Sequence, residues 1–215
     1  MRGIVILVLA AAVGVWAAEW ITVEADADSY VYYYKDDTEE EPQYVDDNFG
    51  GEVELSAWYI NFYRRYPSLI QRRSFIYFDF EGMDPQSSVL EAILSLYITY
   101  LDWGGRFWVY RCREAWDEYE VTWNDQPWFS EILGSWDDTF PLYQYSDVAE
   151  LNAEEIELIV DNPDDNNGII ILTSEDWNCV DFSSREGGFP PRLKLLVSGA
   201  DVVEASWGEI KAAFE

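Results

Sequence analysis

One stretch of the chain combines aromatic and basic residues that could bind a sugar. Its candidate binding residues are Trp58, Tyr59, Arg64, Arg65, Arg72 and Arg73. Aromatic rings stack on the apolar face of a sugar ring, and guanidinium groups donate charged hydrogen bonds to hydroxyl or carboxylate groups. The stretch is therefore a candidate carbohydrate site. The alternative is an extended loop whose aromatic side chains pack and whose arginines pair with the many acidic residues.

Acidic residues offer a second kind of chemistry, the binding of a hard cation. Calcium takes six to eight oxygen ligands from carboxylates, amides and carbonyls. Asp26 and Asp28, at the first expected strand, are the candidate ligands, and a structural calcium ion is the candidate cofactor. The acidic runs at 36–48 and 161–167 are further candidates for a hard cation, but they lack EF-hand spacing, and we favour the alternative that they are solvated loops.

The composition argues against catalysis. The chain has no histidine, which removes histidine general bases, Ser-His pairs and His-ligated zinc. With 42 Asp and Glu residues, carboxylate pairs occur at any spacing, so no glycosidase pair can be inferred. We expect that the protein is not an enzyme, and an enzyme acting on polysaccharide is the weakest alternative.

The charge limits the partners, and the apolar content predicts a folded domain. Against 42 acidic residues stand 13 Lys and Arg, for a net charge of -29 over 215 residues. This charge repels phosphate, so nucleic acid and anionic membranes are excluded as expected partners. Because 49% of the residues are hydrophobic and 17% aromatic, the chain has ample material for a core. The length fits about one domain.

Residues 1–17 have the features of a secretory signal peptide. Arg2 precedes the apolar run 4–15, and Val15-Trp16-Ala17 has cleavage-site spacing. The run is too short for a transmembrane helix, and we expect no transmembrane segment in the mature chain. Loss of Arg2 leaves 12 basic against 42 acidic residues, a net charge of -30. We therefore expect a secreted or cell-surface protein.

Cys112 and Cys179 both lie in the expected mature chain. In an oxidising compartment they favour one disulfide bond that closes a long loop. Two buried free thiols are the alternative.

Short strands dominate the remaining pattern. Alternating or β-rich runs predict strands at 21–24, 30–34, 73–80, 94–101, 106–113, 140–145, 168–173, 179–184 and 192–197. Many short strands without βαβ alternation predict an all-β, antiparallel jelly-roll-like β-sandwich over residues 18–198.

Two short helices complete the expected fold. Asp147 and Glu150 resemble a capping box that starts an internal helix over 148–160, which Asn162-Pro163 ends. An acidic linker begins at residue 199, and a short amphipathic C-terminal helix follows within 206–215.

Three motifs resemble one family. They are Arg73-Ser74-Phe75-Ile76-Tyr77-Phe78-Asp79-Phe80, the run Val121-Thr122-Trp123-Asn124-Asp125-Gln126-Pro127 after Trp116, and Ser183-Ser184-Arg185-Glu186 followed by Pro190-Pro191-Arg192-Leu193. Together they resemble the DNRLRE-domain family, which is related to disaggregatase repeats and to carbohydrate-binding module family 96. Asn48-Phe49-Gly50 and Asn167-Gly168-Ile169 also fit that pattern, so the resemblance covers about residues 26–198.

The resemblance implies a jelly-roll-like sandwich on exported proteins, without implying catalysis. Most of its motif residues are expected to be structural: Trp123, Asn124, Gln126, Pro127, Arg185 and Glu186. We expect the Trp123 ring in the core, and the Asn124 and Gln126 side chains hydrogen-bonded to backbone at a turn. Arg185 and Glu186 are expected on opposite faces of a strand, each paired with other neighbours.

The sequence therefore predicts an exported, non-catalytic surface or carbohydrate-binding module whose partner is a polysaccharide or another cell-surface component. The alternative is a structural or adhesive subunit that self-associates in an extracellular assembly. The negative charge favours neutral glycans unless calcium is present.

Overall fold

The structure is a computed structural model that describes residues 18–63, 67–83, 87–102, 105–137, 139–175 and 177–198. The expected signal peptide, Arg64, Arg65 and the expected C-terminal helix lie outside these residues.

The described part of the chain contains ten strands, which pair in one sheet. They are β1 (Ala18–Asp36), β2 (Glu54–Phe62), β3 (Ser68–Phe78), β4 (Val89–Asp102), β5 (Phe107–Cys112), β6 (Phe129–Trp136), β7 (Gln144–Leu151), β8 (Ile169–Leu172), β9 (Asn178–Ser183) and β10 (Arg192–Ser198). Every pairing between them is antiparallel. The predicted all-β, antiparallel, sandwich-like fold is confirmed.

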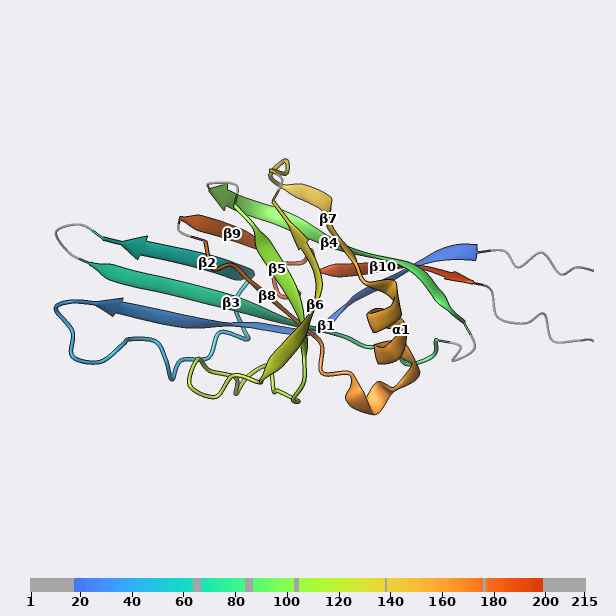
Figure 1. The fold of residues 1–215 in the computed structure, drawn as a ribbon, viewed down its shortest axis with the longest axis horizontal. Coiled ribbons are helices and arrows are strands. Elements are labelled where there is room, and N and C mark those ends of the chain that lie inside the picture. The colour runs from blue at the N-terminus through green and yellow to red at the C-terminus, as the bar shows by residue number, and fades with distance from the viewer. Residues whose placement is uncertain are drawn as a thin grey trace, which may run out of the picture.

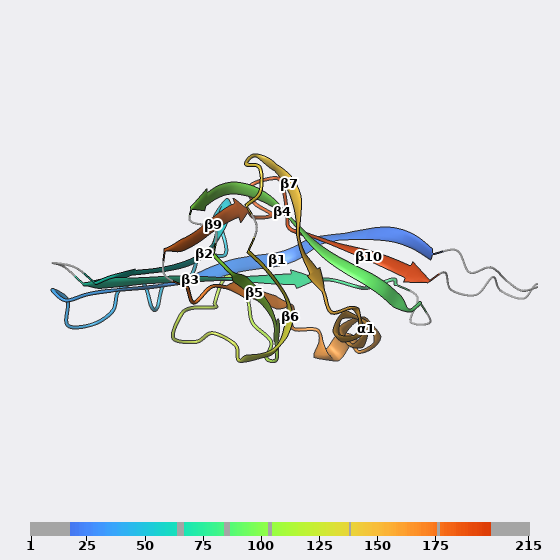
Figure 2. The ribbon, with the colours of Figure 1, turned by 45° about the horizontal axis from the view of Figure 1, so that its top comes forward.

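The sheet curls back on itself because β1 has two partners. Its first part, Ala18–Glu24, pairs with β10, and its second part, from Ala25 to Asp36, pairs with β3. The strand order is β1-β10-β4-β9-β2-β3-β8-β5-β6, and β7 pairs with β4. In Figure 1, β1, β2 and β3 extend along the long axis, with the arrowheads of β1 and β2 at one end, and both ends of the described chain lie at the other end. Figure 2 shows β7 and β9 on one side of β1 and β3, with β5 and β6 on the other.

Two groups of apolar side chains hold this sheet together. The large core includes Leu55, Phe78, Leu94 and Phe182, all at most 2% exposed, and it joins strands that are far apart in the sequence. A smaller core surrounds Phe75, on the side of β3 that faces away from Phe78. Alternate residues of β3 therefore serve different cores, as the period of two in a strand requires.

The internal helix starts later than predicted. Residues 144–151 form strand β7, which pairs with β4, and α1 covers Ala153–Asp161. The N-cap is Asn152, whose side chain accepts from the N–H groups of Glu154 and Glu155. Asp147 thus caps no helix, because pairing with β4 outweighs the local capping pattern. No helix in the described part of the chain is long and apolar enough to cross a membrane.

The predicted disulfide bond is absent, because Cys112 and Cys179 are free, buried thiols. Cys112 belongs to the smaller core around Phe75. Cys179 lies on β9, opposite Trp58 of β2 and Asp102 of β4. The two thiols therefore pack against different neighbours, and burial raises the pKa of each to about 12.

Candidate functional site

Strands β2 and β3 divide the predicted sugar-binding residues between two faces of the sheet. Trp58 pairs with Arg72, and Arg72 pairs with Tyr32 of β1, so these three side chains share one face. Tyr59 and Arg73 follow Trp58 and Arg72 in sequence and therefore point to the other face. The structure brings together only Trp58 and Arg72 among the four predicted residues that it describes.

The Arg72 guanidinium lies among aromatic rings. Its central carbon is 4.1 Å from the ring centroid of Trp58, 4.4 Å from that of Tyr32 and 5.6 Å from that of Tyr30. Among the described residues its only hydrogen bond runs from Nη1 to Ser56 Oγ (3.3 Å), and it forms no ion pair there. Aromatic faces thus hold Arg72 by cation–π attraction.

A carboxylate and a further ring border this arrangement. Asp181 Oδ1 accepts from Trp58 Nε1 (2.8 Å) and from Ser56 Oγ (2.6 Å). Tyr100 of β4 is 43% exposed, and its ring centroid lies 6.4 Å from that of Trp58. We call Tyr32, Trp58, Arg72, Tyr100 and Asp181 the aromatic-arginine cluster. It presents rings, charged donors and an acceptor on one half-buried surface.

Burial raises the pKa of Asp181 above its usual range. The hydrogen bonds from Ser56 and Trp58 and the charge of Arg72 act in the opposite direction, and the charge of Glu54 adds to the rise. The Ser56 and Trp58 donors fix the position of the Asp181 carboxylate, and the bond from Nε1 also orients the Trp58 ring.

The motif around Trp123 lies on the other face of the sheet, where its side chains contact other parts of the fold. The Arg73 guanidinium lies 4.5 Å from the Trp123 ring centroid, and Arg73 Nη1 donates to Gln126 Oε1 (2.8 Å). Gln126 Nε2 donates to the backbone O of Trp123 (2.7 Å), and Pro127 is buried. Two expectations need correction. Trp123 is half-buried beside the smaller core, and the Asn124 side chain donates to the Asp46 carboxylate instead of to backbone.

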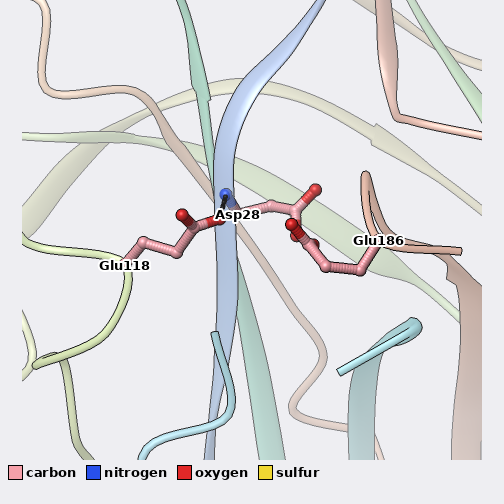
Figure 3. Close-up of side chains that lie close together, drawn as sticks. All are labelled: Asp28, Glu118 and Glu186. Atoms are coloured by element: carbon pink, nitrogen blue, oxygen red, sulfur yellow. Dashed lines mark hydrogen bonds between the residues drawn. The ribbon is translucent and has the colours of Figure 1, made fainter. Parts of the chain in front are cut away.

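A second group of polar side chains joins three distant segments. One oxygen each from Asp28, Glu118 and Glu186 lie within 4.8 Å of one another. Figure 3 shows the Asp28 and Glu186 carboxylates next to each other, with Glu118 approaching from the other side of β1. We call these three residues the carboxylate cluster. Asp28 is 1% exposed and Glu118 is 9% exposed, so two of the three carboxylates of this cluster are buried.

Loop contacts place Glu118 at β1. Asn48 Nδ2 donates to the backbone O of Glu118 (2.9 Å) and of Val121 (2.8 Å). A Cβ on Gly50 would lie 2.0 Å from the Glu118 carbonyl oxygen, so only glycine permits this approach. Glu118 Oε1 then accepts from the backbone N–H of Asp28 (3.0 Å). The Asn48-Phe49-Gly50 motif therefore has a positioning role.

Arg185 supplies the positive charge of the carboxylate cluster. Its Nη2 donates to both oxygens of Glu118 (3.0 and 2.9 Å) and to Glu186 Oε1 (2.9 Å). Its backbone N–H donates to Asp28 Oδ2 (2.8 Å). Arg185 pairs with another neighbour, Glu118, as expected, but the expectation that it does not pair with Glu186 is wrong. Both residues lie in the turn after β9, where strand alternation does not apply.

Asp28 carries the strongest perturbation in this cluster. Burial raises the pKa of its carboxyl from 3.8 to about 7, and the negative charges of Glu186 and Glu118 add to the rise. The N–H and the charge of Arg185 act in the opposite direction. Asp26, the other predicted calcium ligand, is exposed, and its backbone O accepts from Arg185 Nη1.

The sequence reasoning missed several of these residues. Tyr32 stands in the run Tyr30–Tyr34, whose composition predicted a strand but not which ring faces Arg72. Asp181 carried a usable signal, because it is the one acid in the predicted strand 179–184. Glu118 had none, since it is one of many acids in a loop.

The antiparallel β-sandwich-like domain thus presents aromatic rings, a guanidinium and a carboxylate together on one strand face. The sequence model for carbohydrate-binding module family 96 matches residues 19–197, and the chain belongs to this family. No curated protein matches the chain.

Proposed function

We propose that this protein is an exported, non-catalytic carbohydrate-binding module that holds a polysaccharide on the aromatic-arginine cluster. The observation that supports this site most is the Arg72 guanidinium, which lies between Trp58 and Tyr32 and has no carboxylate partner among the described residues. Arg73 and Lys35 also lack a carboxylate partner there, but Arg73 donates to the Gln126 amide and Lys35 to two backbone oxygens, whereas Arg72 donates only to Ser56 Oγ. The Arg72 guanidinium therefore keeps donors that a ligand can use.

The cluster offers the contacts that a sugar needs. The rings of Trp58 and Tyr100 provide apolar surface for stacking, while Arg72 donates and Asp181 accepts hydrogen bonds. Preset rings and a preset guanidinium lose little conformational entropy on binding. Because the net charge is -29 and Asp181 stands in the cluster, we propose a neutral chain as the preferred ligand.

Neighbouring residues on opposite faces provide a matched test of this site. Trp58→Ala removes a ring from the cluster, whereas Tyr59→Ala removes the next ring along β2 from the other face. We expect Trp58→Ala to weaken binding of a neutral β-glucan by at least about tenfold, the effect of losing a central aromatic contact. Tyr59→Ala should bind like the unmodified protein. Titration calorimetry with β-glucan and with alginate, each with calcium and with chelator, measures both variants and the preference for neutral chains.

Equal losses in the two variants would contradict this site, because they would show that binding does not distinguish the faces. If neither polysaccharide binds the unmodified protein, the carbohydrate function itself is contradicted for the polysaccharides tested. A structural or adhesive subunit remains the alternative, and concentration-dependent polymers in sedimentation would favour it.

Export is a separate part of the proposal, supported by the sequence of residues 1–17. N-terminal sequencing of protein recovered from the medium or cell surface tests it. We expect the mature chain to begin at Ala18 or Glu19. A chain that keeps Met1 and stays inside the cell would contradict export without affecting the sugar-binding proposal.

A further inference from the structure

The carboxylate cluster contains a buried polar atom that nothing in the described structure satisfies. Asp28 Oδ1 is buried and has no hydrogen-bond partner among the described residues, although Asp28 Oδ2 accepts from the backbone N–H of Arg185. Buried carboxylate oxygens are almost always hydrogen-bonded or bound to a metal. With Asp28 only 1% exposed, this oxygen requires a partner.

The charges around this oxygen point to a cation. Three carboxylates face one guanidinium, and Arg185 Nη2 already contacts both oxygens of Glu118 and one oxygen of Glu186. In the part of the chain that the structure describes, the second Glu186 oxygen and Asp28 Oδ1 have no such neutralising contact. The three side chains nevertheless lie within 4.8 Å of one another, where like charges repel strongly unless something neutralises them.

We propose that the carboxylate cluster is a binding site for one calcium ion, with Asp28, Glu118 and Glu186 as its protein ligands. All three offer oxygen, the only ligand type that calcium prefers, and no histidine or thiol is among them. Calcium also accepts flexible coordination completed by water, whereas magnesium demands a near-ideal octahedral shell.

Water can complete the coordination and Arg185 can make room for the ion. A pocket of about 460 Å³ adjoins the cluster and is lined by Asp26, Glu118 and Arg185 among others. The Arg185 side chain is 36% exposed, so its guanidinium has solvent into which it can turn when an ion takes over its contacts. Glu118 belongs to the carboxylate cluster and also lines this pocket, so an ion can reach the cluster from the pocket.

Calcium binding to the chelator-treated mature chain, with no glycan present, tests this site. We expect one ion per chain by titration calorimetry, and a rise in the melting midpoint of about 5–10 °C at a hundredfold excess over Kd. Magnesium should give a smaller rise. Because no sugar is involved, the result stands apart from that of the glycan titrations.

Isosteric variants separate this site from the many surface acids. Asp28→Asn and Glu186→Gln should each weaken calcium at least about tenfold, as expected when one carboxylate ligand is lost. Glu120→Gln, an exposed carboxylate near Glu118, should keep the affinity of the unmodified chain. Glu186 is exposed, so Glu186→Gln should fold and decide the matter even if Asp28→Asn does not.

Two results would overturn the site. One is the absence of stoichiometric calcium uptake by the unmodified chain. The other is calcium affinity that survives in Glu186→Gln and Asp28→Asn, which would place the ion elsewhere.

Discussion

Removal of the Arg72 charge should weaken sugar binding more than it weakens the fold. Arg72→Met keeps the apolar stem but removes the guanidinium from its place between Trp58 and Tyr32. Of the three cation–π contacts that are lost, the two shorter ones contribute about 0.5–1 kcal/mol each, or about 1–2 kcal/mol together. In a domain of this size that loss lowers the melting temperature by about 2–8 °C.

The loss in binding follows from the hydrogen bonds that Arg72 would donate to the sugar. A hydrogen bond from a charged group contributes about 1.5–3 kcal/mol, which corresponds to about 10- to 150-fold in Kd. Arg72→Lys should fall in between, because it keeps the charge but loses the planar fork that stacks on the rings. Titration calorimetry with a neutral β-glucan measures Kd, and differential scanning calorimetry measures the melting temperature.

Arg73→Met provides the matched control. The Arg73 guanidinium also stacks on aromatic rings, 4.5 Å from Trp123 and 5.8 Å from Phe129, but on the opposite face. We expect Arg73→Met to lower the melting temperature and to leave Kd unchanged. If both variants lose affinity in proportion to their loss of stability, or if Arg72→Met keeps its affinity, the assignment of the binding face is refuted.

Three further predictions concern the thiols, the turns and the buried acid. In the absence of reductant, Cys112 and Cys179 should react with Ellman's reagent only once the protein is denatured. Both thiols are at most 5% exposed, and burial raises the pKa of each to about 12. Rapid reaction of the native protein would contradict this. Gly168→Ala should lower the free energy of unfolding, measured by urea denaturation, by more than about 2 kcal/mol, because its φ is +77° and a Cβ would lie 2.3 Å from a carbonyl oxygen of β3. Gly82→Ala is the control: its φ is +86° but a Cβ there would meet open space, so the loss should be about 1–2 kcal/mol. Asp181→Asn should be more stable than the unmodified chain at pH 7, and the gain should shrink as the pH falls toward 3.8. Burial raises the folded-state pKa of this carboxyl, so the unmodified chain loses stability as the pH rises above the unfolded value; a pH-independent difference would contradict that cause.

The sequence pattern predicts strands with regular alternation and misses those without it. The runs that became β8, β9 and β10 were placed within a residue or so of their observed bounds. Strand β2 was not predicted, because Trp58-Tyr59-Ile60-Asn61-Phe62 has large apolar residues on both faces and so shows no period of two. Strand β6 contains Gly134 and a similarly irregular pattern, and it too was not predicted.

The internal helix shows the limit of local signals. Asp147 and Glu150 have the spacing of a capping box, yet both belong to β7, where Asp147 pairs with Ser95 and Glu150 pairs with Ile93 of β4. Capping contributes about 1 kcal/mol, whereas the strand buries Val148 and Leu151 in the large core. A pairing between segments that lie about fifty residues apart cannot be read from the capping pattern.

The fate of the two adjacent arginines shows why the candidate site could be predicted only in part. The composition grouped Arg72 and Arg73 in one basic and aromatic stretch. Both lie on β3, where successive side chains point to opposite faces of the sheet. Arg73 closes the smaller core by stacking on Trp123 and bonding Gln126, so its charge is already used within the fold. Arg72 stacks on Trp58 and Tyr32, and among the described residues its one hydrogen-bond acceptor is the Ser56 hydroxyl. Six other described cations form ion pairs with carboxylates, so acids are not in short supply. Arg72 differs from Arg73 in what its guanidinium bonds, since neither forms an ion pair there. That place depends on the register of β1, β2 and β3, and register is what a single sequence does not reveal.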